Sequence, residues 1–148
     1  MKAVDIIGSA GKETIRKAVG AAEQLTSGEI RVFIDEECKE DVMDHAAFVF
    51  AELGMHKTDL RNGVLIYLSL KDHKFAIIGD AGIHAKVGDD FWNHVKEEML
   101  EHFRHGRIVE GIEHAVIQAG NKLKVFFPKQ QQDVNELPDD IVFGNPDK

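Results

Sequence analysis

The sequence predicts an α/β protein, a three-layer α/β/α sandwich around a small mixed sheet, and three observations support this fold class. A strand-like segment, an amphipathic helical segment and a second strand-like segment follow one another across residues 29–70, and a crossover of this length joins parallel strands. Residues 64–68 are apolar at every position, which is typical of a central strand covered on both faces. A polar turn at residues 71–73 and an apolar segment at residues 75–78 then predict an antiparallel hairpin strand beside the central parallel pair.

The first half of the chain alternates between helix and strand. Residues 9–25 have the spacing of an amphipathic helix, and Ser9 is a suitable N-cap. The apolar stripe of this helix consists of Ile15, Ala18, Val19, Ala22 and Leu25. Residues 29–35 alternate as a strand does. Residues 41–53 return to helical spacing behind Asp41, which we expect to cap the second helix.

The second half is mainly helical. A short helix is expected at residues 83–87. Asp89 or Asp90 then starts a long helix that ends before Gly106, and residues 108–127 form the fourth helix. The buried stripe of the long helix is expected to contain Trp92, Val95, Met99 and Phe103.

Residues 1–128 are therefore expected to form a single domain. Residues 129–148, which contain a glutamine run and two prolines, are expected to be a mobile C-terminal tail. Within this tail, residues 141–143 are an isolated apolar cluster, which could dock on the domain or on a partner.

Composition excludes several classes of function. The 148 residues carry a net charge of −8, which argues against nucleic-acid binding because that needs a basic surface. One cysteine, Cys38, permits no disulfide within the chain, and its carboxylate neighbours disfavour a reactive thiolate. No signal peptide is recognisable and no segment approaches the ~20 apolar residues of a membrane span, so we expect a cytoplasmic protein.

Several segments resemble the TPM domain family. They read S-G-E-I-R-V-F-I, R-N-G-V-L-I-Y-L, F-A-I-I-G-D-A-G-I and, after a Phe-Trp pair, F-R-H-G-R-I-V-E-G-I, and the resemblance covers about residues 15–127. That family groups a thylakoid lumen protein, a photosystem II repair protein and a nematode receptor-associated protein with many bacterial proteins.

The resemblance implies a Rossmann-like α/β/α domain, a divalent-cation site that often takes calcium, and the acid phosphatase activity of some plant members. It also implies envelope association, which is frequent among bacterial members. Where the family turn reads G-x-G-L-E, this chain has His84 in place of the glutamate, so the phosphatase chemistry does not carry over residue by residue.

The first candidate site lies at the base of the hairpin. Because the hairpin reverses the chain, the polar residues before its first strand return beside those after its second. The expected metal ligands are Glu29, Asp59, Asn62, Asp80 and Asp89. A hard cation such as Ca²⁺ (or Mg²⁺) prefers such oxygen ligands, and the neighbouring glycines allow carbonyl groups to approach it. The alternative is that these residues only form turns and helix caps, with Arg61 in a surface ion pair or on an anionic ligand.

The second candidate site lies beyond the carboxyl ends of the parallel strands, where open α/β sheets usually bind ligands. Asp35, Glu36 and Glu37 follow the first strand, and Ser69 and Asp72 follow the second. The alternative for this cluster is a solvated run of charges. The sequence favours the hairpin base but leaves the choice between the two ends open.

The remaining groups of candidate residues give weaker support for a function. Glu98, His102 and His105 share one helix face, but a zinc site needs three or four rigidly held ligands, and a helix C-terminus also favours histidine. His94 and His114 are expected to be exposed helix residues, and no motif for a nucleophilic enzyme is present. We therefore expect a divalent-cation-binding domain that acts as a binding or assembly module and takes a protein partner. The alternatives are a metal-dependent acid phosphatase and a protein-interaction module in which the metal is purely structural; no catalytic residue is assigned.

Overall fold

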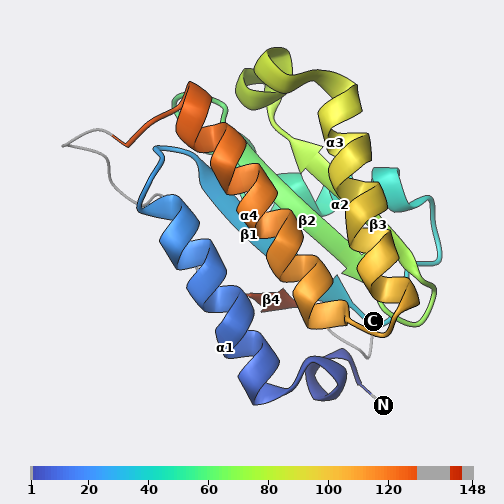
Figure 1. The fold of residues 1–148 in the computed structure, drawn as a ribbon. Helices are drawn as coiled ribbons and strands as arrows, with labels where there is room; N and C mark the ends of the chain where they lie inside the picture. Colours follow the sequence, from blue (N-terminus) through green and yellow to red (C-terminus); the bar gives the residue numbers. More distant parts are fainter. Residues whose placement is uncertain (1, 130–140, 145–148) are drawn as a thin grey trace.

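The computed structural model describes residues 2–129 and 141–144 as one open mixed sheet flanked by helices (Figure 1). In chain order the elements are α1 (Ala3–Glu23), β1 (Glu29–Asp35), α2 (Val42–Glu52), the 3₁₀ helix η1 (Met55–Lys57), β2 (Gly63–Ser69), β3 (Lys74–Gly79), α3 (Ala81–Arg104), α4 (Ile108–Phe126) and β4 (Val142–Phe143). The strand order is β3-β2-β1-β4. β1 is parallel to β2 and β4, whereas β3 is antiparallel to β2, as the hairpin pattern predicts.

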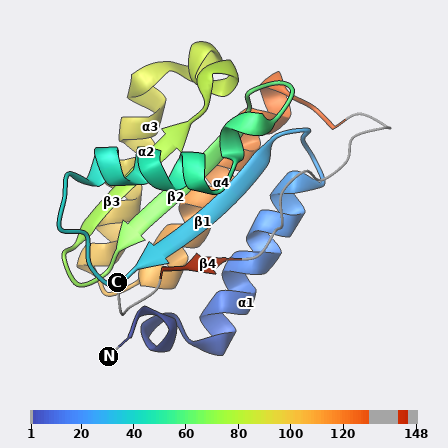
Figure 2. The same cartoon turned by 180° about the vertical axis from the view of Figure 1, so that it is seen from behind.

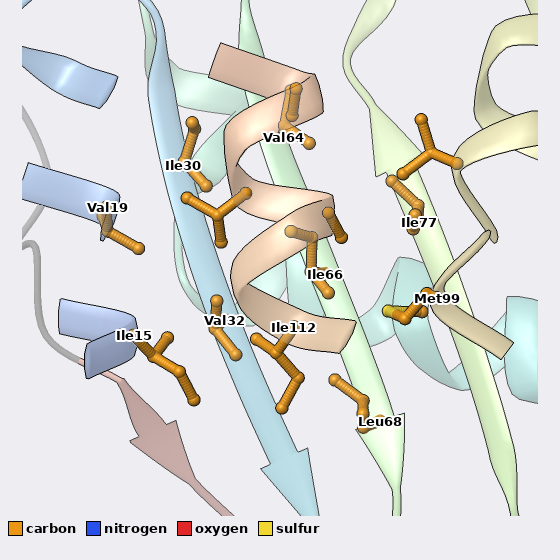
Figure 3. Packing of buried hydrophobic residues seen from close by; sticks show 14 of the residues in the cluster. Ile15, Val19, Ile30, Val32, Val64, Ile66, Leu68, Ile77, Met99 and Ile112 are labelled. Carbon is orange, nitrogen blue, oxygen red and sulfur yellow. The ribbon is translucent and has the colours of Figure 1, made fainter. Parts of the chain in front are cut away.

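Three layers result, which confirms the predicted α/β fold class. Helices α1, α3 and α4 cover one face of the sheet, and α2 crosses the other face (Figures 1 and 2). β2 is buried at every position, because both faces are covered. On the three-helix face, Ile15 and Val19 of α1, Met99 of α3 and Ile112 of α4 pack on the isoleucines, valines and leucines of β1–β3 (Figure 3).

Two helices differ from the sequence prediction, and glycine explains both. α1 begins at Ala3 rather than Ser9, with a kink at Gly8 (φ 72°), and the added turn buries Ala3 and Ile7. α3 joins the two helices that were expected separately, across a kink at Gly88 (φ 75°). A positive φ costs glycine little, so both sites bend the chain without strain.

Residues 141–143 dock on the domain. Val142 and Phe143 pair with Phe33 and Ile34 of β1, and Ile141 is buried. Of the two possibilities that the sequence left open for residues 141–143, the structure shows docking on the domain. Residues 130–140 and 145–148 of the expected tail lie outside the described residues. Among the helices that the structure describes, none is both long and apolar enough to cross a membrane.

A matched pair of substitutions on α4 tests the packing. Leu123 is fully buried and fills the space above Gly28, whereas the Val125 side chain two residues later is 68% exposed. We expect Leu123→Ala to lower the free energy of unfolding by about 2–5 kcal/mol, because it leaves a cavity. Val125→Ala should change it by less than about 0.5 kcal/mol. Urea denaturation measures both, and equal losses would contradict this assignment of the buried face of α4.

Candidate functional site

The strand register brings the two candidate sites to opposite ends of the parallel pair. Glu29 lies opposite Gly63, and Val64 lies opposite Gly79, so the starts of β1 and β2 meet the end of β3. At the other end of the pair, Asp35 lies opposite Ser69. Each end can therefore be described separately.

At the hairpin base an ion pair connects the two loops. Arg61 Nε lies 2.7 Å from Asp80 Oδ2, and Arg61 Nη2 lies 2.8 Å from Asp80 Oδ1. Asp80 is only 7% exposed, and its Oδ1 also accepts a hydrogen bond from the Ala81 amide, which caps α3. The hydrogen bonds and the charge of Asp80 raise the pKa of the Arg61 guanidinium. Both oxygens of Asp80 are thus engaged in holding the loop before β2 against the start of α3.

Close backbone contact supports this connection. The Gly82 amide donates to the Arg61 carbonyl at 2.7 Å. A Cβ at Gly82 would lie 2.1 Å from the Leu60 carbonyl oxygen, so only glycine fits here. This contact packs the two loops together. Donation of carbonyl oxygens to a cation near this glycine stays a prediction.

The five predicted ligands are distributed unevenly. Glu29 and Asn62 are buried at the same sheet edge as Asp80, and the Asn62 amide group lies 3.4 Å from Ser27 Oγ. Asp59 is exposed, and Asp89 is exposed beside His84, at 3.2 Å. In the described part of the chain, no three side chains of His, Cys, Asp or Glu are already gathered to hold a metal ion. A cation on these five residues remains a prediction.

The carboxyl end of the parallel pair opens into a cavity of about 960 Å³. Carboxylates from the loop after β1 and from α2 line it, together with apolar groups such as Phe33 and Phe48 and the lysines Lys2, Lys39 and Lys71. The carboxylates are Asp35, Glu36, Glu37, Glu40 and Glu52. A ligand here would therefore meet carboxylates, lysines and apolar groups together, with five carboxylates against three lysines.

Asp35 is the centre of a hydrogen-bonded chain in this cavity. Its Oδ2 accepts a 2.6 Å hydrogen bond from the buried Tyr67 hydroxyl and lies 3.2 Å from His45 Nε2. His45 Nδ1 in turn contacts Glu40. Burial first, and then the hydrogen bond to Asp35, raise the pKa of Tyr67 far above its ordinary value. The histidine is therefore held between two carboxylates at the cavity wall.

The loop after β1 is held by specific hydrogen bonds and is not only a solvated run of charges. Glu36 Oε1 accepts a hydrogen bond from the Ala3 amide, while Glu36 Oε2 is buried and has no hydrogen-bond partner among the described residues. Asp72 accepts from the Cys38 amide and from Ser69, at 3.3 Å for the hydroxyl, and the Cys38 bond lowers the pKa of Asp72. Glu37, the last of the three carboxylates predicted at the end of β1, is exposed.

Sequence reasoning did not single out His45, Tyr67 or Glu40. One signal was available for Tyr67. It is the only residue with a polar group in the apolar run of β2, and the parallel register places it opposite Phe33, two residues before Asp35. Residues two apart on a strand share a face, so the hydroxyl and the carboxylate could have been predicted to meet. No comparable spacing links His45 to Asp35.

The comparisons with known proteins agree with the fold. The family model described as the TPM domain matches residues 2–122. The NMR structure of BA42 from the psychrophilic bacterium Bizionia argentinensis is 39% identical, with a TM-score of 0.86, and the match covers 93% of this chain and 94% of BA42. No protein with curated annotation matches this chain.

Two more distant structures share the fold alone. The N-terminal domain of a P. gingivalis protein is 19% identical with a TM-score of 0.68, covering 83% of this chain and 80% of that one. The N-terminal domain of the cg2496 protein from Corynebacterium glutamicum is 14% identical with a TM-score of 0.60, covering 79% and 74%.

The tyrosine in the cavity wall gives a pH-dependent prediction. Tyr67 is the only tyrosine of the chain, so tyrosinate absorbance reports it alone. Its pKa is raised in the folded state above the ordinary value of 10.0. The unfolded chain therefore loses this proton first, and the resulting contribution to stability is present below pH 10 and lost above it, by up to about 1.4 kcal/mol per pH unit.

We expect no tyrosinate signal until the protein unfolds in alkali. An absorbance titration measures the tyrosinate, and circular dichroism measured in parallel reports unfolding. Tyr67→Phe is the control, because it removes the hydroxyl and hence this part of the pH dependence above pH 10. Ionisation of Tyr67 near pH 10 in the folded protein would show that the hydroxyl is neither buried nor bonded to Asp35 in solution.

Proposed function

The chain belongs to the TPM domain family, and we propose that it is a divalent-cation-binding module, with calcium as the expected ion and magnesium as the alternative, that serves binding or assembly. The observation that carries the proposal is the acidic cavity beyond the carboxyl ends of β1 and β2. There Glu36 presents a buried oxygen with no hydrogen-bond partner among the described residues, next to Asp35. A hard cation prefers carboxylate oxygens of this kind.

This position is favoured over the hairpin base by the partners of the carboxylates. A cation at Asp80 would have to displace Arg61, whose two nitrogens lie within 2.8 Å of the carboxylate. In the cavity, by contrast, Asp35 shares Oδ2 with neutral or titratable groups, and Glu36 is engaged through one oxygen by a backbone amide. Asp35, Glu36 and Glu40 would hold the ion there.

The affinity is expected to be weak. Calcium takes six to eight oxygen ligands, and the described residues do not already gather three acidic or histidine side chains for a metal. Water would therefore complete the coordination, as in the sites whose Kd lies at about 10⁻⁴–10⁻³ M. The exposed Phe48 at the cavity wall lies where a protein partner could contact the loaded site.

A pair of carboxamide variants tests the ion and its position. In wild type, calcium at about ten times its Kd should stabilise the fold by about 1.4 kcal/mol, which raises Tm by a few degrees. Glu36→Gln should remove most of that calcium-dependent gain, whereas Asp80→Asn should keep it. Amide shifts should change most around residues 35–40 in a calcium titration followed by NMR.

Two results would count against the proposal. If Asp80→Asn loses the gain and Glu36→Gln keeps it, the ion binds at the hairpin base. If millimolar calcium and magnesium change neither Tm nor any amide shift of wild type, cation binding is the wrong function for this chain.

A metal-dependent phosphatase is the second candidate, and the placement of His45 favours it. An imidazole held between Asp35 and Glu40 in a cavity is suited to moving a proton. Cation-assisted hydrolysis would use the ion to polarise a phosphoryl oxygen. Against it stand the acidic lining, which repels a phosphate ester, and the lack of an assigned nucleophile.

We expect turnover of p-nitrophenyl phosphate to be absent or very slow with calcium or magnesium. His45→Ala is the diagnostic variant and His56→Ala, at an exposed site on η1, is its control. Robust metal-dependent turnover that His45→Ala abolishes and His56→Ala leaves intact would assign the function to phosphatase.

A further inference from the structure

Helices α3 and α4 together carry three histidines and one glutamate close to one another, at positions outside the acidic cavity. Glu98 Oε1 lies 2.7 Å from His94 Nε2, and Glu98 Oε2 lies 2.6 Å from His114 Nε2. The His102 and His114 rings have centroids 5.4 Å apart. These four side chains are called the histidine cluster below.

We propose that the histidine cluster is a binding site for a divalent transition metal, with zinc as the representative ion, held by Glu98, His102 and His114 and completed by water. The proposal is independent of the calcium function, because it uses other residues and another ligand chemistry. Imidazole nitrogen suits zinc, copper and nickel, whereas calcium and magnesium prefer oxygen.

The helix geometry supports the ligand set. His94, Glu98 and His102 are spaced four residues apart, so they form one stripe along α3. His114 comes from the facing helix and reaches the middle of that stripe. Glu98 and His114 are partly buried, with 34% and 27% of their side chains exposed, which limits their motion. A site that joins two packed helices is more rigid than one on a single exposed helix.

The ring separation agrees with shared coordination. Zinc lies about 2.0–2.1 Å from an imidazole nitrogen, and two such ligands at a tetrahedral angle place their ring centroids roughly 5 Å apart. The 5.4 Å between the His102 and His114 centroids is close to this value. Side-chain rotation is still required, because the ligand atoms of the described residues are not gathered around one point.

A neighbouring pair supplies a matched control. Glu101 and His105 have the same four-residue spacing on the same helix, with His105 Nδ1 3.6 Å from Glu101 Oε1. Both side chains are 60% exposed. Glu101 forms ion pairs with Arg104 and His105, at the C-terminal end of α3, whereas Glu98 pairs with His114 of α4. If any exposed Glu–His pair on this helix could bind zinc, Glu101 and His105 would contribute as much as the histidine cluster.

The experiment is a zinc titration of the full chain by calorimetry, with cobalt as a spectroscopic probe. We expect one ion per chain, and ligand-field bands typical of nitrogen and oxygen ligands for cobalt. Glu98→Gln and His114→Ala should each weaken binding by at least ~10-fold. Glu101→Gln and His105→Ala should leave it unchanged.

The outcomes are distinct. Retained single-site binding in both Glu98→Gln and His114→Ala, equal weakening by the control pair, or the absence of stoichiometric zinc binding would each overturn the proposal. Excess calcium should not displace zinc, so failure of the calcium proposal would leave this result unaffected. Zinc should also raise the Tm of wild type but not of His114→Ala, because the ion would join α3 to α4.

Discussion

The parallel pairing of β1 with β2 is the constraint on which the rest of the structure depends. It aligns seven residues of each strand, from Glu29 opposite Gly63 to Asp35 opposite Ser69. Because helices cover both faces, the middle of this pair can hold only apolar side chains or polar ones that find a partner. Polar chemistry is therefore displaced to the two ends, and each end receives groups from different loops.

The two ends use similar residue types for different purposes. At the hairpin base, Asp80 accepts from Arg61 and from the start of α3, which fixes two connections and leaves neither of its oxygens without a partner. At the carboxyl end, Asp35 and Glu36 face a cavity and keep part of their hydrogen-bonding capacity. The Tyr67 hydroxyl reaches this end from within the buried strand, and Asp35 supplies the partner that its burial requires.

The sequence could predict the fold because each of its signals is local. The apolar run of β2, the turn before β3 and the helical stripes depend on neighbouring residues only, so the mixed sheet and its hairpin were predictable. The kinks were not, because Gly8 and Gly88 lie within helical patterns and nothing nearby shows that the chain turns there. The pairing of Arg61 with Asp80 was also out of reach, because Arg61 could have paired with Asp59 or Glu29 equally well by spacing.

The histidine cluster also depends on a contact that local sequence patterns could not predict. Spacing along α3 places Glu98, His102 and His105 on one face, and that pattern is visible in the sequence. The residue that converges with Glu98 is instead His114, sixteen positions away on α4, and only the antiparallel packing of the two helices brings it there. A helix pattern reports which residues share a face, whereas a metal site needs ligands that approach one point from more than one direction. The fold therefore keeps the carboxylates of the cavity at the sheet apart from the imidazoles between α3 and α4. Hard cations prefer oxygen ligands and borderline transition metals accept imidazole nitrogen, so the two proposals concern different ligand chemistries and can be tested independently.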